Sequence, residues 1–436
     1  MERLNLFSGS ESIKYLAREM DNESYYVSTL QRYKRFFKYS LARLPIGIVP
    51  DENRLLRLNV KSTTYSPHSV IIAKTGSGKT WLEQTVMSRI ISAGGHVCVP
   101  TDTKNEYNTI NEPLQKEFHK FLIPKGNKFN LLPEKPEGVK VKCYYPTYFS
   151  NDSAPAGSSF AQFRLKDLNL EELLIIAGVE KLSVPQQDLF NTAYESMEEA
   201  EEEPTIENLK NHIDDIVGEE SHSTITRRAL FSVLSNIEKN QCVGDQYQQP
   251  DFVEDMKNGI VPVLNLLGVV DEKQKESSAY LSVILRKIFS AKISGELKGH
   301  VHINIDEAKI FCPQTGNPPS KKIILDMLAR GRRVGISLNL IYQNLSDVPR
   351  EVSEQVRYIY IPPTPNLDMF CEIVKKFASS EFTDNQNFKG DMAKFYLPDL
   401  RVFRDGSRNW CLLDKIKEDP LTIFRPLAPL FKNTTS

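Results

Sequence analysis

The sequence predicts an α/β fold with a mainly parallel central sheet, interrupted by a helical insertion. Three observations support this prediction. An apolar strand at residues 70–72 runs through a glycine-rich loop into an amphipathic stretch, which is typical of a strand–loop–helix unit. A second apolar strand at residues 301–305 ends in two adjacent carboxylates. Between these strands, residues 134–258 are polar and mostly helical in pattern, so the core is expected to resume after them.

The chain has 436 residues, enough for two or three domains or one large domain with insertions. We expect a helical N-terminal segment over residues 1–45 and a first part of the core, with the glycine-rich loop, over residues 46–133. A mainly helical insertion then occupies residues 134–258. The second part of the core and a C-terminal tail fill residues 259–436.

The composition is that of an ordinary globular protein, with 25% charged and 40% hydrophobic residues and a net charge of −1. This balance excludes a chain-wide basic surface, so any contact with nucleic acid must be local. The six cysteines are scattered without a C-x-x-C pair, which argues against a zinc or redox site and predicts buried, reduced thiols. Neither a signal peptide nor an uncharged apolar run of about 18 residues is present, so we expect a cytoplasmic protein without an integral membrane span.

The N-terminal segment interleaves basic and aromatic residues at positions 32–39. A contact with nucleic acid or a membrane surface is one interpretation. We favour the other, an amphipathic helix with its aromatic side packed and its basic side in water, because basic helical faces are common. Apolar runs at residues 46–49 and 55–60 flank a turn and predict a β-hairpin before the strand at residues 70–72.

The glycine-rich loop matches the phosphate-binding pattern G-x-x-x-x-G-K-[ST], except that its first position is alanine. Glycines let successive backbone N–H groups point at phosphate oxygens, and the positive end of the following helix adds to the field. A lysine at the seventh position reaches the β- and γ-phosphates, and the hydroxyl that follows it ligates Mg²⁺. The candidate nucleotide-binding residues are Ala73, Lys74, Thr75, Gly76, Ser77, Gly78, Lys79, Thr80 and Trp81.

Several further elements are expected along the core. We expect strands at residues 96–100, 121–123, 260–267, 336–342 and 358–361, helices at residues 277–291 and 366–378, and a β-rich tail over residues 400–413.

The strand at residues 301–305 carries the second nucleotide motif at its end. Asp306 would hold the Mg²⁺ water shell, and Glu307 would polarise the attacking water. Hydrolysis needs both, since the metal neutralises phosphate charge and a base orients the nucleophile.

Polar residues also surround the strand at residues 336–342. Gln343, at its end, can sense the γ-phosphate, and an arginine just before the strand could act on a neighbouring subunit's nucleotide. Surface arginines and a capping glutamine explain the same pattern equally well.

Taken together, these motifs resemble the HerA/FtsK superfamily of P-loop ATPases, in particular HerA-like DNA translocases and the motor domain of conjugative coupling proteins. The resemblance runs from about residue 46 to residue 420. Its anchors are HSVIIAKTGSGKT from His68, TDTKNEY from Thr101, FNLL from Phe129, the Asp306–Glu307–Ala308 strand end and GRRVGISLNLIYQNLSDVP from Gly331.

The resemblance implies a RecA-like core, ATP with Mg²⁺ as cofactors, a hexameric ring and movement of double-stranded DNA through its channel. Carried over by position, it makes Lys79 and Thr80 nucleotide contacts and Asp306 the metal residue. It makes Glu307 the catalytic base, Gln343 the sensor and Arg332 the arginine that acts across subunits. Tyr342 stands where the family usually has threonine.

Two alternative functions remain open on the sequence. One is a nucleotide-gated scaffold that recruits a protein partner through the N-terminal segment, with ATP as a switch. The other is a motor for protein substrates in a secretion system. DNA-contacting residues are not located by the charge pattern; Lys125 and Lys128 are candidates, although surface lysines are the simpler interpretation.

Overall fold

The computed structural model describes residues 40–50, 52, 54–61, 65–123, 134–147, 159–177, 179–219, 224–239, 242–267, 274–364, 366–384, 386–404 and 407–433. The expectations for the N-terminal segment up to residue 39, including its basic and aromatic stretch, lie outside these residues. So do those for Lys125 and Lys128 and for residues 129–132.

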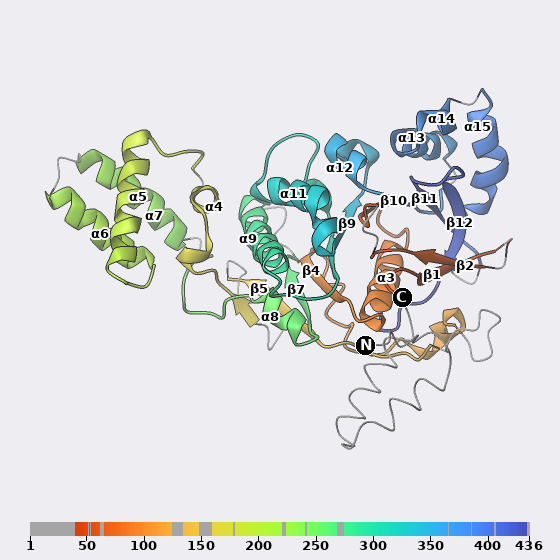
Figure 1. The fold of residues 1–436 in the computed structure, drawn as a ribbon, viewed down its shortest axis with the longest axis horizontal. Coiled ribbons are helices and arrows are strands. Elements are labelled where there is room, and N and C mark those ends of the chain that lie inside the picture. Colours follow the sequence, from red (N-terminus) through yellow and green to blue (C-terminus); the bar gives the residue numbers. More distant parts are fainter. Residues whose placement is uncertain are drawn as a thin grey trace, which may run out of the picture.

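A single twelve-stranded sheet organises the described part of the chain (Figure 1). Its order is β2-β1-β12-β11-β10-β3-β9-β8-β4-β7-β5-β6, and every neighbouring pair from β10 to β6 is parallel. The other four strands add an antiparallel extension at one edge. The strands are β1 Leu44–Val49, β2 Arg54–Leu58, β3 Ser69–Ile72, β4 His96–Asp102, β5 Val141–Pro146, β6 Ser159–Ala161, β7 Val261–Asn265, β8 Val301–Ile305, β9 Ile336–Tyr342, β10 Tyr358–Ile361, β11 Trp410–Asp414 and β12 Leu421–Pro426. The fold class is therefore the α/β class expected from the sequence.

Helices cover both faces of the parallel part of the sheet, which is why its strands are apolar on both sides. Alternate residues of β3 show this arrangement. Val70 and Ile72 belong to the core that includes α9 and α11, whereas Ile71 and Ala73, the residue directly after the strand, belong to the core that includes α3. The helices are α3 Lys79–Ser92, α4 Leu170–Ile176, α5 Val184–Glu199, α6 Ile206–Glu219, α7 Thr224–Lys239, α8 Phe252–Lys257, α9 Gln274–Ile293, α10 Ala308–Phe311, α11 Pro319–Val334, α12 Arg350–Gln355, α13 Leu367–Phe377, α14 Ser380–Thr383 and α15 Phe388–Asp391.

The order of strands around β3 positions the site. β9 lies between β3 and β8, so the residue after β9 falls between the loop after β3 and the carboxylates after β8. β4 lies on the other side of β8 and runs parallel to it. The carboxyl ends of these four parallel strands therefore lie side by side, and open α/β sheets bind their ligands at the carboxyl ends of their strands.

The helices α5, α6 and α7 pack on one another at one end of the molecule, away from the sheet (Figure 1). Helix α4 joins them to the body by packing on both α7 and α9. The expectation of a mainly helical range from residue 134 to 258 differs from the structure at β5 and β6. Strand β5 joins the central sheet beside β7, and β6 joins it beside β5, so the helical part is narrower than expected. The division of the chain into domains stays a prediction.

One expected strand is absent from the structure, and the expected β-rich tail begins later than predicted. Residues 121–123 form no strand, because Phe121 ends a 3₁₀-helix (Lys116–Phe121) and packs edge-on against Trp81. In the C-terminal tail, the described residues 400–404 and 407–409 form no strand beyond an isolated bridge between Val402 and Arg408, so the expected β structure starts at β11, inside the expected range, and continues past it in β12. Among the helices that the structure describes, none is long and apolar enough to cross a membrane.

Candidate active site

The glycine-rich loop after β3 adopts the backbone shape that its sequence predicts. Gly76 and Gly78 have φ angles of 79° and 88°, in the left-handed region that L side chains rarely adopt. Gly78 precedes the first residue of α3, so the N–H groups of that helix end face the loop. Ala73 fits because it directly follows β3 and its backbone N–H still donates to the Tyr342 carbonyl oxygen at the end of β9, over 2.9 Å. The alanine in place of glycine is therefore compatible with the loop.

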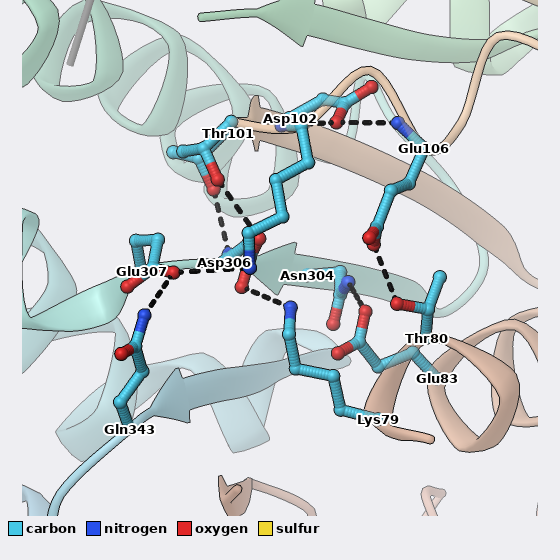
Figure 2. Close-up of polar contacts among 12 residues, drawn as sticks. Lys79, Thr80, Glu83, Thr101, Asp102, Glu106, Asn304, Asp306, Glu307 and Gln343 are labelled. Atoms are coloured by element: carbon cyan, nitrogen blue, oxygen red, sulfur yellow. Dashed lines mark hydrogen bonds and ion pairs between the residues drawn. The ribbon is translucent and has the colours of Figure 1, made fainter. Parts of the chain in front are cut away.

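Lys79 and Asp306 form a buried ion pair at the centre of the site (Figure 2). The Lys79 Nζ donates to Asp306 Oδ1 over 2.8 Å. The other carboxylate oxygen accepts a 3.0 Å hydrogen bond from Thr103 Oγ1, and the Asp306 N–H donates to Thr101 Oγ1 over 2.8 Å. Burial alone would lower the pKa of Lys79, but the carboxylates of Glu83 and Asp306 outweigh it and raise that pKa. The P-loop lysine is therefore charged and already held by a carboxylate.

Thr80, the second residue of α3, is held by a carboxylate that the sequence analysis did not single out. Its Oγ1 donates to Glu106 Oε2 over 2.6 Å (Figure 2). Glu106 lies in the loop after β4, and its backbone N–H donates to the Asp102 carboxylate over 3.0 Å. Hydroxyl and carboxylate oxygens are the ligands that Mg²⁺ prefers, and it usually takes one or two carboxylates together with phosphate oxygens. The oxygens of Thr80, Asp306 and Glu106 thus suit a Mg²⁺ ion that arrives with a nucleotide.

Glu307 and Gln343 are brought together as the strand order requires. Gln343 Nε2 donates to Glu307 Oε1 over 2.5 Å (Figure 2). Lys104 Nζ lies 3.3 Å from the same oxygen, while Glu307 Oε2 is buried without a hydrogen-bond partner. Glu307 also has a φ angle of 47°, which is uncommon for a residue with a side chain and is often associated with functional sites. The second carboxylate is thus placed with one oxygen held and one free.

A network of buried polar side chains lies next to the site and joins the elements that carry it. Glu83 Oε2 accepts hydrogen bonds from the Tyr107 hydroxyl and from Asn304 Nδ2, the latter over 3.0 Å. Asn304 in turn accepts a 2.6 Å hydrogen bond from Asn339 Nδ2. Burial raises the pKa of Glu83 to about 7, although Lys79 acts in the opposite direction. This network ties α3 to β8 and β9, the elements that carry the catalytic candidates.

The remaining predicted residues lie apart from this cluster. Lys74 and Thr75 are exposed in the loop. The Trp81 side chain is half-buried, packs against Phe118 and donates to the Leu427 carbonyl oxygen over 3.0 Å, so its indole serves packing.

Arg332 lies in the last turn of α11, before β9, whereas Gln343 follows β9. The seven residues of that strand separate them by roughly 20 Å. The protomer therefore does not place Arg332 in its own site.

Four residues of the site could not be assigned a role from the sequence, where they stand only within a family motif: Thr101, Thr103, Lys104 and Glu106. A usable signal existed, because these polar residues follow an apolar strand, as Asp306 and Glu307 do. What the sequence could not show is that β4 and β8 are neighbours.

This fold and this site define a P-loop nucleoside triphosphatase. The chain belongs to the family described as "Helicase HerA, central domain", which matches residues 44–288. A curated relative, the DNA double-strand break repair helicase HerA of Saccharolobus solfataricus, is 24% identical over 322 residues, 72% of this chain. The chain spans 57% of the length of that relative.

Solved structures show the same fold at low identity. VirB4 of Thermoanaerobacter pseudethanolicus has a TM-score of 0.52 and 14% identity, covering 89% of this chain and 96% of that one. The unbound bacterial conjugative coupling protein TrwB (TrwBdeltaN70) has a TM-score of 0.51 and 12% identity, covering 92% and 93%. TrwB in complex with ADP and Mg²⁺ has a TM-score of 0.51 and 11% identity, covering 92% and 95%.

Proposed function

We propose that this protein is an ATP-hydrolysing motor that forms a ring and translocates double-stranded DNA in the cytoplasm. The observation that carries the proposal is the assembled hydrolytic set, in which the Lys79–Asp306 ion pair lies beside Glu307 held by Gln343. A protein that only binds nucleotide needs the P-loop lysine, whereas a hydrolase also needs a base for the attacking water.

Each residue has a task that follows from its position. Lys79 exchanges Asp306 for the β- and γ-phosphates when ATP binds, and the P-loop N–H groups bind the same phosphates. Thr80 and Asp306 would hold the metal, and Glu106 would orient the Thr80 hydroxyl, which already donates to it. Mg²⁺, when bound, neutralises phosphate charge and aligns the γ-phosphoryl group. Glu307 then orients a water molecule and accepts its proton, and Gln343 keeps the carboxylate in place.

The ring is supported by the position of Arg332. Arg332 lies near the amino end of β9, whereas its own P-loop lies at the carboxyl ends of the strands. It can therefore complete a nucleotide site only in a neighbouring subunit. Arginines supplied across an interface stabilise the transition state of phosphoryl transfer. DNA as the track is supported by membership in the HerA family and by the curated relative, a DNA repair helicase.

An ATPase assay with and without linear duplex DNA, run beside light scattering with an ATP analogue, tests the proposal. We expect duplex DNA to stimulate hydrolysis and the analogue to favour a hexamer. Slow hydrolysis that ignores DNA, together with nucleotide-dependent binding of a protein partner, would support a scaffold instead. Stimulation by a protein substrate alone would support a secretion motor.

A further inference from the structure

Lys104 lies closer to the chemistry than its place in the sequence suggests. It follows β4, on the far side of β8 from the P-loop, yet its Nζ lies 3.3 Å from Glu307 Oε1. That Nζ atom is buried and has no hydrogen-bond partner, so the ion pair with Glu307 is the contact that holds it.

The loop that carries Lys104 has a defined shape. The Asp102 carboxylate accepts hydrogen bonds from the backbone N–H groups of Lys104, Glu106 and Tyr107. Asn105 has a φ angle of 58° and accepts a 2.6 Å hydrogen bond from Asn265 Nδ2. The backbone is thus fixed from two sides, and the lysine side chain is presented from a rigid support rather than from a loose loop.

Each of the two adjacent carboxylates is paired with a lysine. Lys79 pairs with Asp306 at 2.8 Å, and Lys104 pairs with Glu307 at 3.3 Å. Lys79 must leave its carboxylate to bind phosphate. Glu307 must contact the water that attacks the γ-phosphorus. Because Lys104 contacts Glu307, its flexible side chain can also reach the γ-phosphate.

We propose that Lys104 is a catalytic residue that acts within its own subunit on the γ-phosphate. Without nucleotide, the Lys104 ammonium is paired with the Glu307 carboxylate. With ATP bound, its ammonium moves to the γ-phosphate oxygens and releases Glu307 for the water. The water oxygen then forms a bond to the γ-phosphorus, the bond to the ADP oxygen breaks, and Glu307 accepts the proton of the water. Lys104 stabilises the charge on the equatorial oxygens during this step.

The test compares Lys104→Met and Lys104→Gln with Lys104→Arg. Lys142→Met is a matched control, because Lys142 is equally exposed and pairs with the buried Asp255, which belongs to another part of the sheet. Nucleotide affinity is measured with ADP and with ATPγS, and kcat and KM with ATP. We expect the Met and Gln variants to lose about a hundredfold in kcat and to bind ATPγS more weakly. Their ADP affinity should stay unchanged, since ADP has no γ-phosphate.

Lys104→Arg should recover part of kcat, because it keeps the charge, and Lys142→Met should behave like the unaltered protein. The proposal is overturned if both Lys104→Met and Lys104→Gln keep kcat within about twofold, or if ADP and ATPγS affinities fall equally. Binding and hydrolysis are measured without DNA, so a protein that hydrolyses ATP but ignores DNA would contradict the motor and leave this inference intact.

Discussion

Gln343 Nε2 donates a 2.5 Å hydrogen bond to Glu307 Oε1, so the residue after β9 holds the carboxylate that follows β8. The bond exists because β9 lies between the P-loop strand β3 and β8 in the sheet.

Glu307→Gln should retain ATP binding and lose turnover by at least about a hundredfold, because the amide cannot accept the proton of the water. Single-turnover hydrolysis and binding of a fluorescent ATP analogue separate the two effects. Equal losses in binding and turnover would show that Glu307 supports the fold of the site instead.

Gln343→Ala should lower kcat by about a hundredfold with a smaller effect on ATP affinity, since it frees Glu307 Oε1 from its donor. Steady-state kinetics measure both parameters. An unchanged kcat would contradict the positioning role of Gln343.

Glu106→Gln should raise the Mg²⁺ concentration needed for half-maximal ATPase activity by about tenfold to a hundredfold. The reason is that Glu106 Oε2 accepts the hydrogen of the Thr80 hydroxyl and so orients the oxygen that ligates the metal. A magnesium titration checks this, with Glu112→Gln as a control in an exposed ion pair. A half-saturating concentration that does not change would argue against Glu106 at the metal.

Arg332→Ala should abolish ATPase activity while leaving nucleotide binding to the isolated subunit intact. A mixture of Arg332→Ala and Glu307→Gln subunits should regain activity, because some interfaces then join an intact Glu307 to an intact Arg332. Arg330→Ala is the control, since Arg330 is exposed and pairs with Asp326 on its own helix. A mixture as inactive as its components would contradict action across an interface.

Glu83→Gln should change how stability depends on pH. The folded pKa of Glu83, about 7, lies above its ordinary value of 4.5, so the native state keeps a proton that the unfolded chain releases. The free energy of unfolding of the unaltered protein therefore falls as pH rises from 4.5 to 7. Above pH 7 this decrease stays constant, at most about 3 kcal/mol. The variant stays neutral and lacks this loss. Denaturant midpoints of both proteins at pH 5 and pH 8 should diverge in favour of the variant at pH 8, and an unchanged difference would contradict the assignment.

How far the sequence predicts this site depends on how local each signal is. The P-loop and the Asp306–Glu307 strand end are each written in a few consecutive residues, so both could be found without the fold. Thr103 and Asp306 are 203 residues apart, and their contact depends on the order of strands in the sheet. Trp81 was expected to contact nucleotide because it follows the P-loop in the sequence. Its packing partner Phe118 is distant in the sequence and could not be predicted. The strands β5 and β6 also escaped prediction, because pairing of β5 with β7 and of β6 with β5 stabilises them more than their own pattern does.

The measurement that tests the central claim most directly is displacement of a third strand from a linear duplex. A motor that moves along double-stranded DNA releases a triplex-forming oligonucleotide in its path, and does so only while it hydrolyses ATP. We expect release with ATP and the unaltered protein, and none with ATPγS or with Glu307→Gln. Sustained ATP hydrolysis on the bound duplex, with the third strand still in place, would contradict the account.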